Sequence, residues 1–167
     1  MKIKRFTILI VGVILMLSFL TYGQTWNEED RATAKSILQE KFQLEESLAF
    51  NQEGALDTET LQAFPASVSV TDEGLAEGLT VALIRYGEDT FLPLFVTSLP
   101  ELEPPYGFAL MNDAGEALFV GPAEIEGTEE GPESPGVELL EEKEETYEVA
   151  FKFTEGTIRI ELPKTIS

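Results

Sequence analysis

The feature that most constrains this chain is a pair of segments near its C-terminus in which apolar and polar side chains alternate. The apolar positions along residues 146–153 and 157–162 are Tyr147, Val149, Phe151, Phe153, Ile158, Ile160 and Leu162. Residues 154–156 between them have the composition of a turn. Alternation with a period of two, with one polar face, is typical of antiparallel strands that have one face in water. These residues therefore predict a β-hairpin.

Further apolar segments separated by turn residues lie upstream of this hairpin. We expect strands at residues 67–70, 79–86, 91–97, 106–111 and 116–120, with hairpin turns at 87–89 and 112–115. No helical crossover separates these segments, which favours an antiparallel arrangement. The predicted fold is α+β and mainly β: an N-terminal helix packed on an antiparallel, hairpin-built sheet or β-sandwich of about seven strands. Pro93 has no N–H, so we expect its strand to lie at an edge or to carry a bulge.

Helical periodicity is confined to the region before these strands. Residues 26–50 are predicted to form a helix; Thr25 and Glu28 have the spacing of a capping box, and Asn27 is an alternative cap. Its apolar stripe comprises Ala34, Ile37, Leu38, Phe42 and Leu48. We expect this stripe to cover a sheet of the same chain, with a partner helix as the alternative. A second, short helix is predicted at residues 57–64, ended by Pro65.

The N-terminus has the three parts of a secretory signal. Lys2, Lys4 and Arg5 precede an apolar run of fifteen residues, 6–20, and small residues follow. We predict a signal peptide at residues 1–23. An uncleaved anchor is the alternative, although the run is shorter than the roughly 20 residues that span a bilayer. The expected location is periplasmic, cell-surface or extracellular. The helical segment 24–66 and the β domain 67–167 are expected to form one compact domain.

The charge of the chain restricts its partners. There are 31 acidic and 11 basic residues, and removal of residues 1–23 would leave a net charge of −23. Such a surface repels nucleic-acid and anionic lipid phosphates. We therefore expect no nucleic-acid binding, and membrane contact only through the signal segment if it is kept. Cations and basic protein surfaces remain as electrostatic partners, while solubility or a salt-rich habitat is the simpler explanation of the acidity.

The chain contains no His and no Cys, which removes most catalytic chemistry. A Ser-His-Asp triad, His-ligated metal sites and thiol nucleophiles are excluded. Glycine-rich phosphate loops and serine-nucleophile motifs are also missing. Paired carboxylates alone could support a hydrolase, but with 31 acidic residues such pairs indicate little. We predict that the protein is not an enzyme and has no cofactor.

Residues 121–145 contain ten Glu and a single Lys. The weak metal-ligand candidates in this acidic segment, for calcium, are Glu124, Glu126, Glu129, Glu130 and Glu133. No calcium-loop motif accompanies them, and Gly, Ser, Thr and Pro surround them. We predict a solvated connector between two hairpins, with residues from Val137 rejoining the fold as a strand or a helical turn. A calcium site and a docking surface are the alternatives.

Together these observations predict a small, exported, acidic, non-catalytic protein that acts by protein–protein contacts. An exposed strand edge is the expected docking mode, because such edges recruit extended segments. An extracellular calcium- or carbohydrate-binding module is the first alternative. A hydrolase that uses carboxylates alone is the second.

Overall fold

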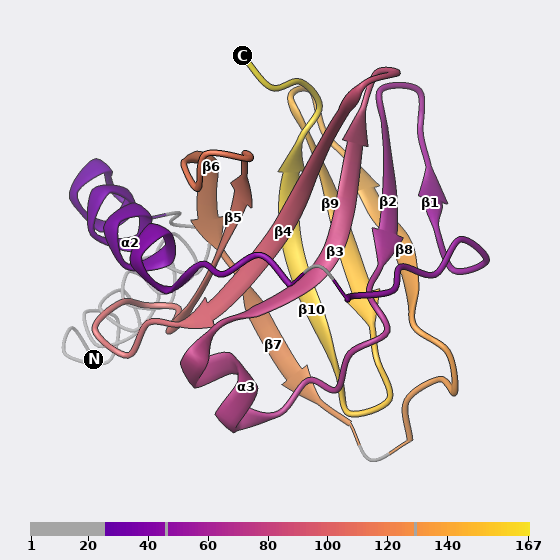
Figure 1. The fold of residues 1–167 in the computed structure, drawn as a ribbon, viewed down its shortest axis with the longest axis horizontal. Helices are drawn as coiled ribbons and strands as arrows, with labels where there is room; N and C mark the ends of the chain where they lie inside the picture. The colour runs from indigo at the N-terminus through magenta and orange to yellow at the C-terminus, as the bar shows by residue number, and fades with distance from the viewer. Residues whose placement is uncertain (1–25, 46, 129) are drawn as a thin grey trace, which may run out of the picture.

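The computed structural model describes residues 26–45, 47–128 and 130–167, which form two antiparallel sheets and two helices (Figure 1). The first sheet has six strands in the order β1-β2-β3-β4-β5-β6, and the second has four in the order β7-β10-β9-β8. The predicted class is confirmed, because the protein is mainly β with an N-terminal helix. The described residues contain ten strands, however, where about seven were expected.

The bounds of the elements follow the chain from one sheet into the other. The first sheet comprises β1 (Leu56–Asp57), β2 (Leu61–Pro65), β3 (Leu79–Tyr86), β4 (Thr90–Ser98), β5 (Tyr106–Met111) and β6 (Ala117–Pro122). The second comprises β7 (Glu124–Gly127), β8 (Gly136–Glu142), β9 (Thr146–Lys152) and β10 (Gly156–Pro163). Helix α2 (Glu28–Lys41) precedes the first sheet, and α3 (Asp72–Glu77) lies between β2 and β3. Only Ala123 separates β6 from β7, so the chain changes sheets there.

The main core lies between the two sheets. It is one cluster of buried side chains from β2, β3, β4 and β5 on one side and β9 and β10 on the other. The alternation that predicted the last hairpin is confirmed, because its apolar positions Val149, Phe151, Ile158 and Leu162 are fully buried. Their burial removes apolar surface from water, which is the main stabilisation of the sandwich.

A second core lies on the outer face of the first sheet, where α2 covers β4, β5 and β6 (Figure 1). Ala34 and Leu38 on the helix are 0% exposed, so the predicted contact with a sheet of the same chain is confirmed. Trp26, just before the helix, packs where Gly107 has no side chain, and a Cβ there would lie 2.4 Å from the indole ring. The helix ends at Lys41 rather than at residue 50, because Phe42 is extended and the next apolar residue, Leu44, faces solvent.

The two expected hairpin turns of the first sheet are present. Gly87 between β3 and β4 and Gly115 between β5 and β6 have positive φ angles of 66° and 77°. The Asn112 side chain accepts hydrogen bonds from the N–H groups of Ala114 and Glu116. Local turn chemistry therefore sets these connections, as the sequence predicted.

Two predictions upstream of β3 are wrong. Residues 57–64 are not a helix but belong to the β1–β2 hairpin, since Leu61 and Ala63 alternate into the sandwich core and pair with β3. The side chain of Thr58 forms the turn, accepting from the N–H of Leu61 and donating to its carbonyl. Residues 67–70 are not a strand either, because the carboxylate of Glu155 accepts the N–H of Val70 and the hydroxyl of Ser69.

The expectation that the strand of Pro93 lies at an edge or carries a bulge is also wrong. Its strand, β4, lies between β3 and β5, and the irregularities of register fall elsewhere. The pairing of β4 with β5 begins only at Leu94, so at Pro93 the strand pairs with β3 alone. A proline is therefore tolerated in a central strand because its own position is a local edge.

In the described part of the chain, no helix is both long and apolar enough to cross a membrane. The predicted signal peptide, residues 1–23, lies outside the described residues, as does Thr25. The cap of α2 is formed by Asn27, whose side chain accepts from the N–H of Asp30 at 2.8 Å while the Asp30 carboxylate accepts in return.

Candidate functional site

The acidic segment 121–145 is mostly sheet. Strands β7 and β8 occupy its two ends, and the connector between them is limited to residues 128–135. The prediction of a solvated connector is therefore wrong for β7, whereas the expected return of the chain to the fold from Val137 is confirmed, as a strand. Ile125 on β7 and Val137 on β8 pack against the sandwich core, and both strands pair with the C-terminal hairpin. Ile125, an apolar residue inside the acidic sequence, was the signal that could have revealed β7.

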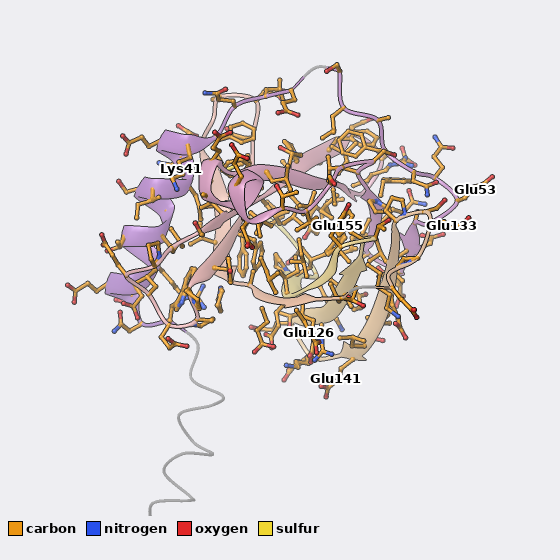
Figure 2. All side chains as sticks on the ribbon, turned by 90° about the horizontal axis from the view of Figure 1, so that it is seen from below. Lys41, Glu53, Glu126, Glu133, Glu141 and Glu155 are labelled. Carbon is orange, nitrogen blue, oxygen red and sulfur yellow. The ribbon has the colours of Figure 1, made fainter. Side chains whose placement is uncertain are left out.

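The described metal-ligand candidates are divided between a strand and the connector. Glu124 and Glu126 lie on β7, whereas Glu130 and Glu133 lie in the connector, and Glu129 is outside the described residues. Figure 2 shows Glu126 and Glu133 at separate places on the molecule. Among the residues that the structure describes, no three acidic side chains are grouped so as to hold a metal ion. The calcium hypothesis therefore gains no support from their arrangement.

The outer face of the second sheet consists of charged side chains that partly compensate one another. Glu161 and Glu148 are directly opposite on β10 and β9, and Glu148 is opposite Glu141 on β8. The ammonium of Lys143 lies 2.5 Å from the Glu161 carboxylate and 3.7 Å from that of Glu148. Its hydrogen bond to Glu161, with the nearby carboxylates, raises the pKa of Lys143 above the usual value. One lysine thus offsets the repulsion among three neighbouring carboxylates.

A cavity of about 340 Å³ lies where α2, β6 and β10 meet. Its apolar wall includes Phe108 and Phe119, and three basic side chains line it, namely Arg31, Lys143 and Arg159. Three carboxylates, those of Glu124, Glu148 and Glu161, balance this charge. The six charged side chains therefore give the cavity no net charge.

The carboxylates of this cavity do not have the arrangement that a glycosidase uses. That mechanism needs two carboxyl groups on opposite sides of the scissile bond. Glu148 and Glu161 are instead neighbours on adjacent strands, and both engage the ammonium of Lys143. Their geometry therefore favours a structural ion-pair cluster over a hydrolytic pair.

The edges of the two sheets differ in how they are protected. Strand β1 has two residues and β7 has four, and short strands offer little for another chain to pair with. The edge of β6 is occupied by α2. The guanidinium of Arg31 donates to the Val120 carbonyl at 2.7 Å, and the Gln39 side-chain oxygen accepts the N–H of Ala117 at 2.9 Å. These three edges are therefore short or capped.

Strand β8 forms the fourth edge; β1 and β2 lie close to it, and its residues beyond Val137 are exposed. Residues 138–142 all face solvent, including Leu139 and Leu140, which are 37% and 41% exposed. Its first residues are fixed, since Val137 donates its N–H to the carbonyl of Gly54 at 2.9 Å. Beyond Val137, the strand pairs only with β9 in the described part of the chain.

Backbone groups of β8 point away from the sheet. Because Val137 donates to Gly54 and not to β9, the alternation of antiparallel pairing also places the N–H and C=O of Leu139 on the outer side. A register shift between Leu139 and Glu141 interrupts the alternation after that point. The strand thus offers outward hydrogen-bonding groups beside two exposed leucines.

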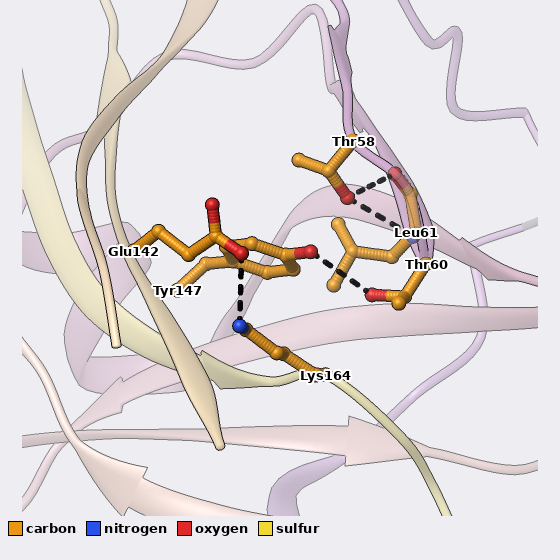
Figure 3. Close-up of polar contacts among 6 residues, drawn as sticks. All are labelled: Thr58, Thr60, Leu61, Glu142, Tyr147 and Lys164. Carbon is orange, nitrogen blue, oxygen red and sulfur yellow. Dashed lines mark hydrogen bonds and ion pairs between the residues drawn. The ribbon is translucent and has the colours of Figure 1, made fainter. Parts of the chain in front are cut away.

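The far end of β8 is held by a polar cluster (Figure 3). The ammonium of Lys164, just after β10, lies 2.9 Å from the Glu142 carboxylate and 5.0 Å from the centre of the Tyr147 ring. The Thr60 hydroxyl contacts the Tyr147 hydroxyl at 3.3 Å and so links the first sheet to this cluster. Strand β8 therefore contacts the rest of the fold at both ends, through the Gly54 carbonyl and through Lys164.

Comparisons of the chain with models of known protein families, with curated proteins and with solved structures find no match. Within the described residues, the β8 edge and the cavity beside α2 are the two candidate sites for a partner or a ligand.

Proposed function

We propose that this is an exported, non-catalytic protein that acts by protein–protein contacts, recruiting an extended segment of a partner to the edge of β8. The observation behind this proposal is the exposed middle of β8, which is anchored at both ends and has outward backbone groups at Leu139. An added strand gains main-chain hydrogen bonds along such an edge, while side-chain contacts give specificity. Helix α2 covers the edge of β6, so the exposed edge of β8 is not a feature that all edges of the two sheets share.

The sequence supports the remaining parts of the proposal. The basic residues and the apolar run at the N-terminus favour export. The lack of His and Cys removes the usual nucleophiles and bases, and this favours a role in binding. The expected location is the periplasm, the cell surface or the exterior.

The experiment is capture of partners by the C-terminally tagged full-length chain from envelope and secreted fractions. The test variant is Leu139→Pro, which removes an outward N–H without removing a hydrogen bond to β9. The control is Leu44→Pro, which changes an exposed leucine outside both sheets. Circular dichroism and the fluorescence of Trp26 establish that both variants are folded.

Each outcome decides the proposal. A partner that is captured by the native chain and the control but lost by Leu139→Pro supports strand addition at β8. Capture that Leu139→Pro leaves unchanged would place the contact elsewhere and overturn the β8 mode. If no partner is captured by the folded native chain, the interaction function itself is rejected.

A second candidate function is binding of a neutral, polar ligand such as a sugar in the cavity beside α2. Its volume of about 340 Å³ is within the range of small-molecule sites. Its balanced charges offer both donors and acceptors beside an apolar wall, which suits a hydroxylated ligand more than an ion. Titration with a panel of neutral disaccharides, monitored by the melting temperature, tests it, since a ligand of the native state raises that temperature.

A further inference from the structure

The side chains along the exposed part of β8 are acidic and apolar. Glu138 precedes the two leucines and Glu141 and Glu142 follow them, and the register shift confines regular pairing to short stretches. From Val137 to Glu142 the strand has six residues, of which the first already donates to Gly54. A partner segment of about five residues is therefore the length that this edge can accept.

The three carboxylates are not equally neutralised. Glu138 pairs with Lys152, and Glu142 pairs with Lys164 at 2.9 Å. No basic side chain of the described residues lies within ion-pair distance of Glu141. Figure 2 shows Glu141 at the periphery of the molecule. Glu141 is therefore the carboxylate of this edge that has no ion pair within the described residues, with Lys143 acting on it only at longer range, and it lies beside Leu139 and Leu140.

This charge argues against a second copy of the chain as the occupant. Pairing of two β8 edges would bring Glu138, Glu141 and Glu142 of both copies together, and like charges across adjacent strands are destabilising. Both copies would also carry the overall charge of −20 of the full chain. Charged residues on an exposed edge commonly block self-pairing in this way.

We infer that the β8 edge selects a basic partner, namely an extended segment of about five residues in which Lys or Arg alternates with apolar residues. This inference rests on the proposed function. The apolar residues of the segment cover Leu139 and Leu140, its cations lie near Glu141, and its backbone pairs with the outward groups of Leu139. The negative potential of the chain steers such a segment to the edge and raises its rate of association.

The test uses fluorescence anisotropy with a labelled, end-blocked peptide of sequence Lys-Leu-Lys-Val-Lys-Leu-Lys. One control peptide has the same composition with its lysines in a block, and a second replaces every Lys by Glu. The protein variants are Leu139→Pro and Glu141→Lys. Glu40→Lys on α2 is the matched control, because Glu40 is an exposed glutamate and the net charge changes equally.

We expect the alternating basic peptide to bind at least about tenfold more tightly than the blocked one, and the acidic peptide not to bind. Leu139→Pro and Glu141→Lys are each expected to weaken binding about tenfold or more. The first removes a backbone hydrogen bond to the peptide, and the second removes a charge-assisted contact. Glu40→Lys is expected to change it by less than about threefold, because that charge is distant and screened.

Other results would overturn the inference. Equal binding of the alternating and blocked peptides would indicate general attraction to an acidic surface and no strand addition. If Glu141→Lys and Glu40→Lys weaken binding equally, the peptide does not bind specifically at the β8 edge. If the capture experiment finds a partner that Leu139→Pro loses, but no basic peptide binds, the inference on partner chemistry fails and the proposed function stands. If the capture experiment and the peptide binding both fail, the proposed function and the inference on partner chemistry are both rejected.

Discussion

The hydrogen bond between Tyr86 and Pro163 gives a direct test of how the two sheets are joined. Tyr86 ends β3 and Pro163 ends β10, and the buried tyrosine hydroxyl donates to the proline carbonyl at 2.7 Å. The substitution Tyr86→Phe keeps the ring, so it creates almost no cavity. It removes the bond and leaves a buried carbonyl without its donor, which costs about 1–2 kcal/mol of unfolding free energy. For a chain of this size, that corresponds to a fall of roughly 3–6 °C in the melting temperature.

The assay is urea unfolding followed by the fluorescence of Trp26, the only tryptophan, which is 4% exposed and packed in the second core. Circular dichroism at the same urea concentrations establishes that both cores unfold together. The control is Tyr106→Phe, because no side-chain hydrogen bond of Tyr106 is found within the described residues. A loss of less than about 0.5 kcal/mol for Tyr86→Phe, or an equal loss for the control, would refute the role assigned to this bond.

The same tyrosine predicts how stability responds to alkaline pH. Burial raises the pKa of Tyr86 above its ordinary value of 10.0, because the folded state disfavours the charged phenolate. Its contribution is therefore complete below pH 10 and is lost as the pH rises further, since the unfolded state releases the proton first. We expect the native chain to lose stability more steeply above pH 10 than Tyr86→Phe. Equal slopes in urea titrations at pH 9 to 11 would contradict this account.

Four further predictions concern two other contacts, the net charge of the chain and its N-terminus. The hydrogen bond from the Ser69 hydroxyl, and then that from the Val70 N–H, lowers the pKa of Glu155, so its stabilisation is present above the usual pKa of 4.5 and lost as the pH falls below it. Glu155→Gln is thus expected to flatten the acid limb of urea titrations, by less than about 1 kcal/mol because the group is exposed. Gly107→Ala should destabilise by about 1–3 kcal/mol and shift the emission of Trp26, because a Cβ there would overlap the indole; a change below about 0.5 kcal/mol would contradict the packing. The melting temperature should rise equally in NaCl and CaCl₂ of matched ionic strength, because salt screens the repulsion, whereas a rise specific to calcium would indicate a site. Intact-mass measurement of the exported chain should show an N-terminus at residue 24, and a retained residue 1 would indicate an anchor.

The parts of the fold that the sequence predicted are those in which local patterns and burial agree. Alternation along β9 and β10 identified the residues that fill the main core, since each strand has one buried face. The turns at residues 87–89 and 112–115 were predicted from their composition, and in the structure Gly87 and Gly115 have positive φ angles, which glycine adopts without strain. Ala34 and Leu38 lie on the buried face of α2 because helical periodicity placed them together.

The predictions that failed are those in which distant residues decide the structure. Residues 57–64 were expected to be helical, but Leu61 and Ala63 are held in β2 by pairing with β3. The carboxylate of Glu155, far along the chain, fixes Ser69 and Val70 outside any strand. In both cases a tertiary contact outweighs a weak local preference.

The candidate site was the hardest part to predict, because its sequence fits a mobile segment by composition. By composition alone, a segment with ten Glu residues among Gly and Pro is expected to be disordered. Val137 correctly indicated that the chain rejoins the fold there, whereas Ile125, which packs against the same core from β7, was not recognised. Most side chains of β7 and β8 are exposed, so these edge strands lack the regular apolar alternation that makes β9 and β10 recognisable.

The same geometry explains why the acidic residues of β8 can have two roles. Carboxylates at Glu138, Glu141 and Glu142 protect an exposed edge from pairing with another copy of the chain. Protection alone would be served by a lysine as well as by a glutamate, and it would not require an anchored strand. Strand β8, however, is fixed by Gly54 at one end and by Lys164 at the other, and its exposed leucines remain between these anchors. A fixed, negatively charged edge disfavours pairing with another copy of the chain, and under our proposal it accepts a basic strand without reorganisation, so protection and recognition would follow from one arrangement.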